Sequence, residues 1–246
     1  MVAQDMKAIH DSEHTLVMGV LNITEDSFSD GGLWLDPANA KAHGEAMMKD
    51  GADIIDIGAE STRPGAKRVS EEDEQTRVLG AVDALIPEGA VLSIDTTRAS
   101  VARMALEHGA QIINDVSGGR LDREVPHVVA EHSESLYIVQ HWRGWLAGSA
   151  GDVPDADTSV YANGVVDDVY DELMKQVDDV LQAGVSPSQI IIDPGLGFSK
   201  PSVEHNFPLM TALERFNATG YPVLIGASRK RFVGAALADA GIDKPD

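Results

Sequence analysis

Polar or glycine-rich residues follow seven short apolar runs of this 246-residue sequence, each time at the point where the run ends. They are Asn22, GAESTRPGA (58–66), Asp95, Asn114-Asp115, His141, DPGLGFSK (193–200) and GASRKRF (226–232). In parallel α/β barrels the carboxyl ends of the strands meet on one rim, where catalytic and binding residues gather. We therefore expect these side chains to surround a single pocket.

Asp95, Asn114 and Asp193 together supply two carboxylate acceptors and one amide that both donates and accepts. This set suits a flat heterocycle with a guanidine-like edge, where ring N–H and exocyclic NH2 donors lie side by side. Each residue also has a simpler interpretation, because an Asp or Asn after a strand commonly caps a helix or forms a turn. Asp56 and His141 are expected to be buried and hydrogen-bonded rather than reactive.

Basic residues fall in or beside the same presumed loops, although the chain as a whole is acidic. They are Arg63, Lys67, Arg68, Lys200, Arg229, Lys230 and Arg231. Their clustering predicts a local site for an anion such as pyrophosphate or a carboxylate. For Lys67, Arg68 and Arg231, solvated surface charge is an equally good interpretation.

A metal site and an anion site at a helix N-terminus are also expected on the same rim. The sequence has no cysteine, and its eight histidines show no HExxH spacing, so a thiolate or histidine metal site is not expected. Asn22 is a neutral oxygen ligand compatible with Mg2+, which needs few protein ligands when phosphate supplies others. Free N–H groups at the start of the helix after Ser228 favour a substrate carboxylate.

The elements that must position these residues can be read from alternating apolar runs and amphipathic stretches. Strands are expected at 15–22, 53–58, 91–95, 111–115, 136–141, 190–194 and 222–228, and helices at 38–50, 71–86, 99–108, 122–132, 164–183, 204–214 and 230–239. Near-continuous apolar strands separated by helices indicate a parallel sheet covered on both faces. Seven such units predict an α/β protein with a (β/α)8 TIM barrel whose eighth β-α unit is absent from the sequence given.

Composition excludes several classes of protein. The formal net charge of −21 disfavours a nucleic-acid partner and an anionic membrane surface. No apolar run approaches the ~18 residues of a membrane span, and the N-terminus has no apolar signal region. The missing cysteines fit a cytoplasmic enzyme. We expect one domain over residues 1–246.

Six motifs carry a family resemblance. In chain order, MGVLNITEDSFSDGG, IDIGAESTRPGA, SIDTTR, IINDVSGG, IIDPGLGF and IGASRKRF resemble the dihydropteroate synthases of folate biosynthesis, from about residue 15 to 237. The resemblance implies a transferase that condenses 6-hydroxymethyl-7,8-dihydropterin pyrophosphate with p-aminobenzoate, forming 7,8-dihydropteroate and pyrophosphate with Mg2+. It also implies a homodimer and a sulfonamide target.

By resemblance, Asp95, Asn114 and Asp193 would read the edge of the pterin ring, and Lys230 would bridge pterin and p-aminobenzoate. The family's C–O bond is thought to break early, leaving a pterin methyl cation for the aromatic amine to attack. That step needs charge stabilisation on the departing pyrophosphate more than a strong base. Arg63 suits this task, so Arg63 and Lys230 are the expected catalytic residues.

The pyrophosphate and p-aminobenzoate sites are assigned in the same way. Asn22 would hold Mg2+ and pyrophosphate, while Thr62 and Arg63 would touch pyrophosphate and shape the p-aminobenzoate site with Pro64. The remaining expected contacts to the second substrate are Phe198, which would stack on its ring, Ser228, which would meet its carboxylate, and Arg229. The loops after the first two strands would then act as lids.

Three departures from the family pattern stand out. Ala59 replaces a glycine, Gln140 replaces a common methionine before His141, and the sequence stops before the Arg-x-His motif of the eighth strand. We interpret the missing Arg-x-His motif as a truncation of the sequence. Two other functions stay open: a catalytically silent pterin-binding paralogue, and a pterin-dependent methyltransferase barrel, which needs neither the SFSDGG loop nor the SxRK motif.

Overall fold

Six parallel strands build the sheet of the protein, of which the computed structural model describes residues 9, 12–24, 36–60, 68–144 and 158–242. The strands lie side by side in chain order: β1 (Met18–Asn22), β2 (Ile54–Gly58), β3 (Leu92–Asp95), β4 (Ile112–Asp115), β5 (Leu136–Gln140) and β6 (Ile190–Asp193). Parallel neighbours in chain order are the arrangement of a TIM barrel. In the described residues the sheet is not closed, with β1 and β6 at its two edges.

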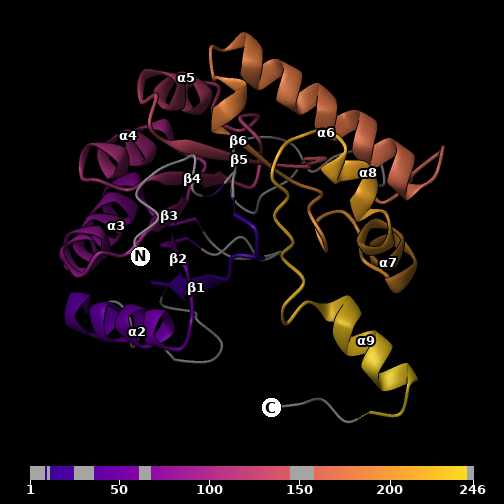
Figure 1. Ribbon diagram of the computed structural model, residues 1–246, viewed down its shortest axis with the longest axis horizontal. Helices are drawn as coiled ribbons and strands as arrows, with labels where there is room; N and C mark the ends of the chain where they lie inside the picture. Colours follow the sequence, from indigo (N-terminus) through magenta and orange to yellow (C-terminus); the bar gives the residue numbers. More distant parts are fainter. Residues whose placement is uncertain (1–8, 10–11, 25–35, 61–67, 145–157, 243–246) are drawn as a thin grey trace.

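Helices follow the strands and pack outside them. They are α2 (Pro37–Lys49), α3 (Glu71–Leu85), α4 (Ala99–Glu107), α5 (Glu124–Glu131), α6 (Val165–Gln182), α7 (Val203–Thr211), α8 (Leu213–Asn217) and α9 (Arg231–Asp239), with short 3-10 turns η2 (Ile86–Glu88) and η3 (Pro187–Gln189). Figure 1 shows α2 to α9 as an arc around the strands. Among these helices none is long and apolar enough to span a lipid bilayer.

Local sequence explains where the helices begin and end. Asp36 caps α2 by accepting a hydrogen bond from the Ala38 N–H at 2.9 Å, with Pro37 at the first helical position. Ser70 caps α3 in the same way through the Asp73 N–H at 3.1 Å. The predicted helix 204–214 is instead two helices, α7 and α8, which meet at Ala212.

Successive side chains of each strand point to opposite faces of the sheet, and they form two separate apolar clusters. The larger cluster, with Ile55, Ile57 and Ile113, packs the sheet against the helices. The residues one position away point into the curve of the sheet and form a second cluster: Ile54, Val91, Ile112, Leu136, Ile138 and Ile191. Toward the carboxyl ends of the strands, the residues that face inward are polar instead of apolar. The inner face is therefore an apolar floor below a polar rim.

The expected seventh strand, 222–228, is reduced to one bridge between Ile192 and Val223. The Ile192 N–H donates to the Pro222 carbonyl at 2.9 Å, and the Leu224 N–H donates to the Ile192 carbonyl at 2.8 Å. The next donor in a parallel ladder would come from residue 194, which is Pro194 and has no N–H. The prediction of a full strand was wrong because a proline in the neighbouring segment ends the pairing.

Candidate active site at the carboxyl ends of the strands

Four adjacent strands bring their last inward-facing residues to one level. In the pairing register Asn22 is opposite Gly58, Gly58 is opposite Asp95, and Asp95 is opposite Asn114. We call these four residues the strand-end row. Because the strands are parallel, one shared register places the row on one rim, so the predicted convergence of Asn22, Asp95 and Asn114 is a consequence of the sheet.

Gly58 leaves room in the middle of this row. A Cβ atom there would lie 3.3 Å from the Asn22 Oδ1 atom and 3.6 Å from an Asp95 carboxylate oxygen. Asn22 is exposed, and its amide oxygen and an Asp95 carboxylate oxygen flank the space above Gly58. Among the described residues there is no cluster of three or more His, Asp or Glu side chains suited to a metal ion. The row fits a cation such as Mg2+ that takes one neutral protein oxygen and other ligands from phosphate.

Asp56 lies one layer below the row and is satisfied within the protein. It accepts a hydrogen bond from Ser93 Oγ at 2.6 Å and from Asn114 Nδ2 at 3.2 Å. Burial raises its pKa, which these two hydrogen bonds oppose. The expectation of a buried, hydrogen-bonded carboxylate is confirmed for Asp56.

Anchoring by Asp56 orients the Asn114 amide. The Nδ2 group is directed to Asp56, whereas the buried Oδ1 atom finds no hydrogen-bond partner in the part of the chain that the structure describes. A buried acceptor without a partner is costly, so such an atom points to a ligand that donates to it. The orientation agrees with the predicted role of Asn114 toward a donor-rich ring edge.

Asp95 carries the strongest electrostatic perturbation of the row. Its pKa is raised well above the usual range by burial and then by the negative charges of Asp56, Asp115 and Glu60. It does not cap the next helix, because α4 follows Arg98 and has no side-chain cap. Positively polarised N–H donors of a ligand would relieve this accumulation of negative charge. The simpler interpretation of Asp95 as a cap is therefore wrong.

Asp193 ends β6 opposite Gln140 and combines both roles considered for it. One carboxylate oxygen accepts the Gly195 N–H at 2.7 Å, which makes the predicted turn. Burial raises its pKa, while the positive charge of Lys230, the Gly195 hydrogen bond and the charge of Lys200 act in the opposite direction. Two cations therefore favour the carboxylate form of a buried acid.

Lys230 reaches back from the start of α9 to the turn after β6. Its Nζ atom donates to the Leu196 carbonyl and lies 4.8 Å from the centroid of the Phe198 ring. Its pKa is lowered by burial, an effect that the negative charge of Asp193 opposes. Lys230, Phe198 and Asp193 thus come together, as their predicted shared site requires.

Five other residues were predicted to contact the substrates. Two of them are exposed before α9, and three lie outside the described residues. Ser228 and Arg229 are exposed just before α9, and Arg229 adopts a left-handed backbone conformation with φ 58°. Thr62, Arg63 and Pro64 fall outside the described residues.

The two ends of the 61–67 segment are joined by an ion pair. Glu60 accepts bidentate hydrogen bonds from Arg68, the shortest at 2.8 Å, and Arg68 also donates to Thr97 Oγ1 at 3.0 Å. Arg68 is therefore not solvated surface charge, and that interpretation of it was wrong. A hollow of about 430 Å3 lies beside this ion pair, lined by Arg68, Glu71, Thr97, Arg98, Ser100, Leu121 and Asp122, none of which belongs to the strand-end row.

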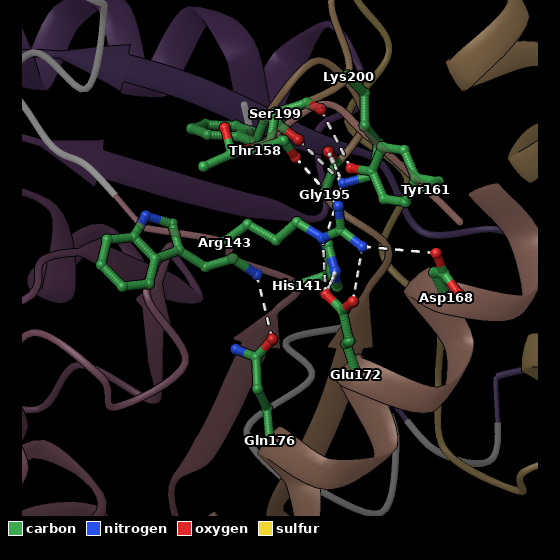
Figure 2. Close-up of polar contacts among 12 residues, drawn as sticks. His141, Arg143, Thr158, Tyr161, Asp168, Glu172, Gln176, Gly195, Ser199 and Lys200 are labelled. Atoms are coloured by element: carbon green, nitrogen blue, oxygen red, sulfur yellow. Dashed lines mark hydrogen bonds and ion pairs between the residues drawn. The ribbon is translucent and has the colours of Figure 1, made fainter. Parts of the chain in front are cut away.

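Sequence reasoning missed a polar network below the turn after β6. His141 is fully buried, and its Nε2 atom lies 3.0 Å from Glu172, which also binds Arg143. Figure 2 shows these side chains directed toward one another, His141 and Arg143 from the segment after β5 and Glu172 from α6. His141 is thus the satisfied histidine that was expected. Glu172 lies 31 residues further along the chain in a helix, where no local pattern distinguishes it from a surface acid.

A stability prediction follows from the turn after β4. Asp115 is fully buried and accepts hydrogen bonds from Tyr137 Oη at 2.7 Å and from the Gly119 N–H at 2.8 Å. Tyr137→Phe should lower the free energy of unfolding by about 1–3 kcal/mol, because a buried carboxylate oxygen loses a donor. Urea denaturation measures this loss. Tyr170→Phe, on a half-buried ring that contacts Phe216, is the matched control, and equal losses in the two variants would contradict the prediction.

The parallel sheet in chain order, with polar residues at its carboxyl rim, is the architecture of a TIM-barrel enzyme. The family model described as pterin binding enzyme matches residues 18–245, and the chain belongs to this family. Within it, the chain groups with the dihydropteroate synthases. The protein of that name from Mycobacterium leprae is 48% identical over 232 residues, which cover 94% of this chain and 79% of that protein.

Solved structures agree with this placement. The dihydropteroate synthase of Xanthomonas albilineans with 4-aminobenzoic acid is 36% identical, has a TM-score of 0.80, and aligns over 92% of this chain and 77% of the other. That of Clostridium difficile in the presence of pteroic acid is 34% identical, has a TM-score of 0.79, and aligns over 92% and 81%.

Proposed function

We propose that the chain is a dihydropteroate synthase, which joins 6-hydroxymethyl-7,8-dihydropterin pyrophosphate to p-aminobenzoate and releases pyrophosphate. The observation that carries this proposal is that β3, β4 and β6 of one parallel sheet bear Asp95, Asn114 and Asp193 at their carboxyl ends, with the Asn114 Oδ1 atom lacking a donor among the described residues. The family match and the relatives of that name support the reaction.

The residues divide the chemistry between an acidic and a cationic part. Asp95, Asn114 and Asp193 accept hydrogen bonds from the ring and exocyclic N–H groups of the pterin. Their negative charge also stabilises positive charge that develops on the pterin methylene carbon as its C–O bond breaks. Lys230, which lies between Asp193 and Phe198, is positioned to contact both substrates.

Magnesium and the second substrate are assigned by chemistry. Asn22 would hold Mg2+ together with phosphate oxygens of the substrate, and the ion would supply positive charge beside the pyrophosphate. Arg63 assists from the second loop, with Thr62 and Pro64 beside it. Phe198, Ser228 and Arg229 form the p-aminobenzoate side, where the ring stacks and the carboxylate binds. We further propose a cytoplasmic homodimer with no nucleic-acid or membrane partner and one domain over residues 1–246.

A coupled pyrophosphate-release assay tests this function. With both substrates and Mg2+, we expect release that requires p-aminobenzoate and a product that absorbs as dihydropteroate. Tight pterin binding without release would identify a silent pterin-binding paralogue instead. Transfer of a methyl group from a methylated folate would identify the methyltransferase alternative.

Asn22→Ala should raise the Mg2+ concentration needed for half-maximal rate by about tenfold, because one of few protein ligands is lost. Calorimetry of Mg2+ binding in the presence of pyrophosphate should show the same shift without turnover. Asn217→Ala, on the exposed end of α8, is the matched control. An unchanged Mg2+ requirement in Asn22→Ala would remove Asn22 from the metal site.

A further inference from the structure

A buried ammonium group lies behind the turn that joins β6 to α7. Lys200 is 1% exposed, and its Nζ atom donates to the carbonyls of Gly195 and Phe198, each at 3.0 Å. Its third neighbour is His141 Nδ1 at 2.9 Å. None of these three acceptors is a carboxylate, although fully buried lysines are normally paired with one. Lys200 therefore brings a positive charge into the site without a direct ion pair to any of the described residues.

The protonation state of His141 determines which atoms of this network donate hydrogen bonds and which accept them. Burial and the charge of Lys200 lower its pKa to about 4, so the ring is neutral at physiological pH. Glu172, whose pKa is lowered to about 2 because hydrogen bonds from His141 and Arg143 outweigh its burial, accepts from Nε2. Nδ1 is then an acceptor, and Lys200 is its donor.

The network returns to the same turn by a second route. Arg143 binds Glu172 and lies 3.9 Å from the centroid of the Tyr161 ring. Tyr161 donates its hydroxyl to the Ser199 carbonyl at 3.1 Å. Figure 2 shows Lys200 and Tyr161 close together beside Ser199 and Gly195 of this turn. This network thus holds three carbonyls of the turn, two through Lys200 and one through Tyr161, in addition to the Leu196 carbonyl held by Lys230.

One residue connects the buried cation to the pterin-facing acid. Gly195 donates its N–H to Asp193 and accepts from Lys200 through its carbonyl, so the two charges flank a single residue. A Cβ atom at Gly195 would lie 2.6 Å from the His141 carbonyl, so the backbone there is tightly enclosed. The other charged groups that act on Lys200 are Lys230, Arg143 and Glu172.

We propose that Lys200 is a positioning residue that keeps Asp193 ionised and holds the 193–200 turn in the shape that binds the pterin. This inference rests on the proposed function. The substrate class is a neutral heterocycle with adjacent N–H donors, which a carboxylate accepts at either oxygen, whereas a carboxylic acid presents an O–H donor at one of them.

The expected pH dependence has a definite sign. Burial raises the pKa of Asp193 and the charge of Lys200 opposes this rise, so removing that charge makes Asp193 bind a proton at higher pH. Pterin affinity is then lost earlier on acidification. Burial also lowers the pKa of Lys200 to about 7, so its charge acts mainly below that pH. The variant should therefore differ most from the unmodified chain in acid.

Lys200→Met tests the proposal, with affinity for the dihydropterin pyrophosphate measured by calorimetry without p-aminobenzoate. We expect binding weaker by about threefold at about pH 8.5 and by about 30-fold at about pH 5.5, because protonation of Asp193 in the variant removes an acceptor for the pterin. The quantity compared is the ratio of the Kd of the variant to the Kd of the unmodified chain at the same pH. Titration of the ligand itself cancels in this ratio. Lys175→Met, on the exposed side of α6, is the matched control and should keep a ratio near one.

Two further variants separate charge from shape. Tyr161→Phe releases the Ser199 carbonyl without changing any charge, so its effect should not depend on pH. Lys200→Gln, which is also neutral, should repeat the rise of the ratio in acid. A ratio for Lys200→Met that is constant with pH would overturn the proposal, and so would unfolding of both Lys200 variants, because Lys200 would then serve folding alone. Failure of the unmodified chain to bind the pterin would instead refute the proposed function.

Discussion

Asp193→Asn should weaken binding of the dihydropterin pyrophosphate by about 100- to 1,000-fold, or about 3–4 kcal/mol. The amide keeps one oxygen for the Gly195 N–H, which is 2.7 Å from the carboxylate in the unmodified chain. The other oxygen becomes an NH2 group, which faces the N–H donors of the pterin. Two donors that face each other leave both without an acceptor, and this mismatch is the source of the large effect.

The control for this change is Asp122→Asn. Asp122 lies in the loop after β4 and also accepts a backbone hydrogen bond two residues on, from the Glu124 N–H at 3.0 Å. It makes the same kind of turn but follows β4 in a loop and does not end a strand, whereas Asp193 is the last residue of β6. Pterin affinity should stay within about twofold in this variant. If calorimetry gave the two variants equal affinity, Asp193 would be a turn former and not a ligand.

Lys230→Met should lower kcat/KM by about 100- to 1,000-fold for both substrates. The change removes the hydrogen bond to the Leu196 carbonyl, the contact with the Phe198 ring, and a positive charge near Asp193. Because the first two contacts shape the p-aminobenzoate side and the third acts on the pterin side, neither substrate should be spared. Steady-state kinetics with each substrate varied in turn measures both effects.

Arg231→Met is the matched control, because Arg231 is the exposed next residue and begins α9. It carries the same charge at almost the same place in the chain, so a general electrostatic effect would appear in both variants. We expect its kcat/KM to change by less than about threefold. An Arg231 variant as impaired as Lys230→Met would show that the cationic segment, rather than Lys230 itself, carries the effect.

The strand-end row was predictable because it depends on two properties that a sequence displays. Apolar runs show where Asn22, Asp95 and Asn114 end their strands, and helices between the runs show that the strands are parallel. Parallel strands in chain order can place such residues only on one rim. Six motifs in order then narrowed the chemistry to a family, which the comparisons confirm.

The rest depended on contacts between residues far apart in the chain. Lys200 looked like a loop cation, and only the carbonyls of a turn and a histidine 59 residues away make its burial tolerable. The seventh strand was overpredicted because its own residues are good strand formers, whereas Pro194 of the neighbouring segment decides the pairing. Neither fact is present in a local pattern.

The proline that ends the pairing gives the two sides of the pocket different mechanical properties. Asn22, Asp95 and Asn114 stand on backbone that is fixed by continuous ladders, so the side that reads the heterocycle acts as a rigid template. The opposite side of the pocket is formed by the segment after Val223, which has no further strand pairing with the sheet in the described residues. Lys230 of this segment contacts the turn after β6 only through its side chain, which donates to the Leu196 carbonyl. Selectivity should accordingly be strict for the ring system and permissive for the size of the amine that attacks it.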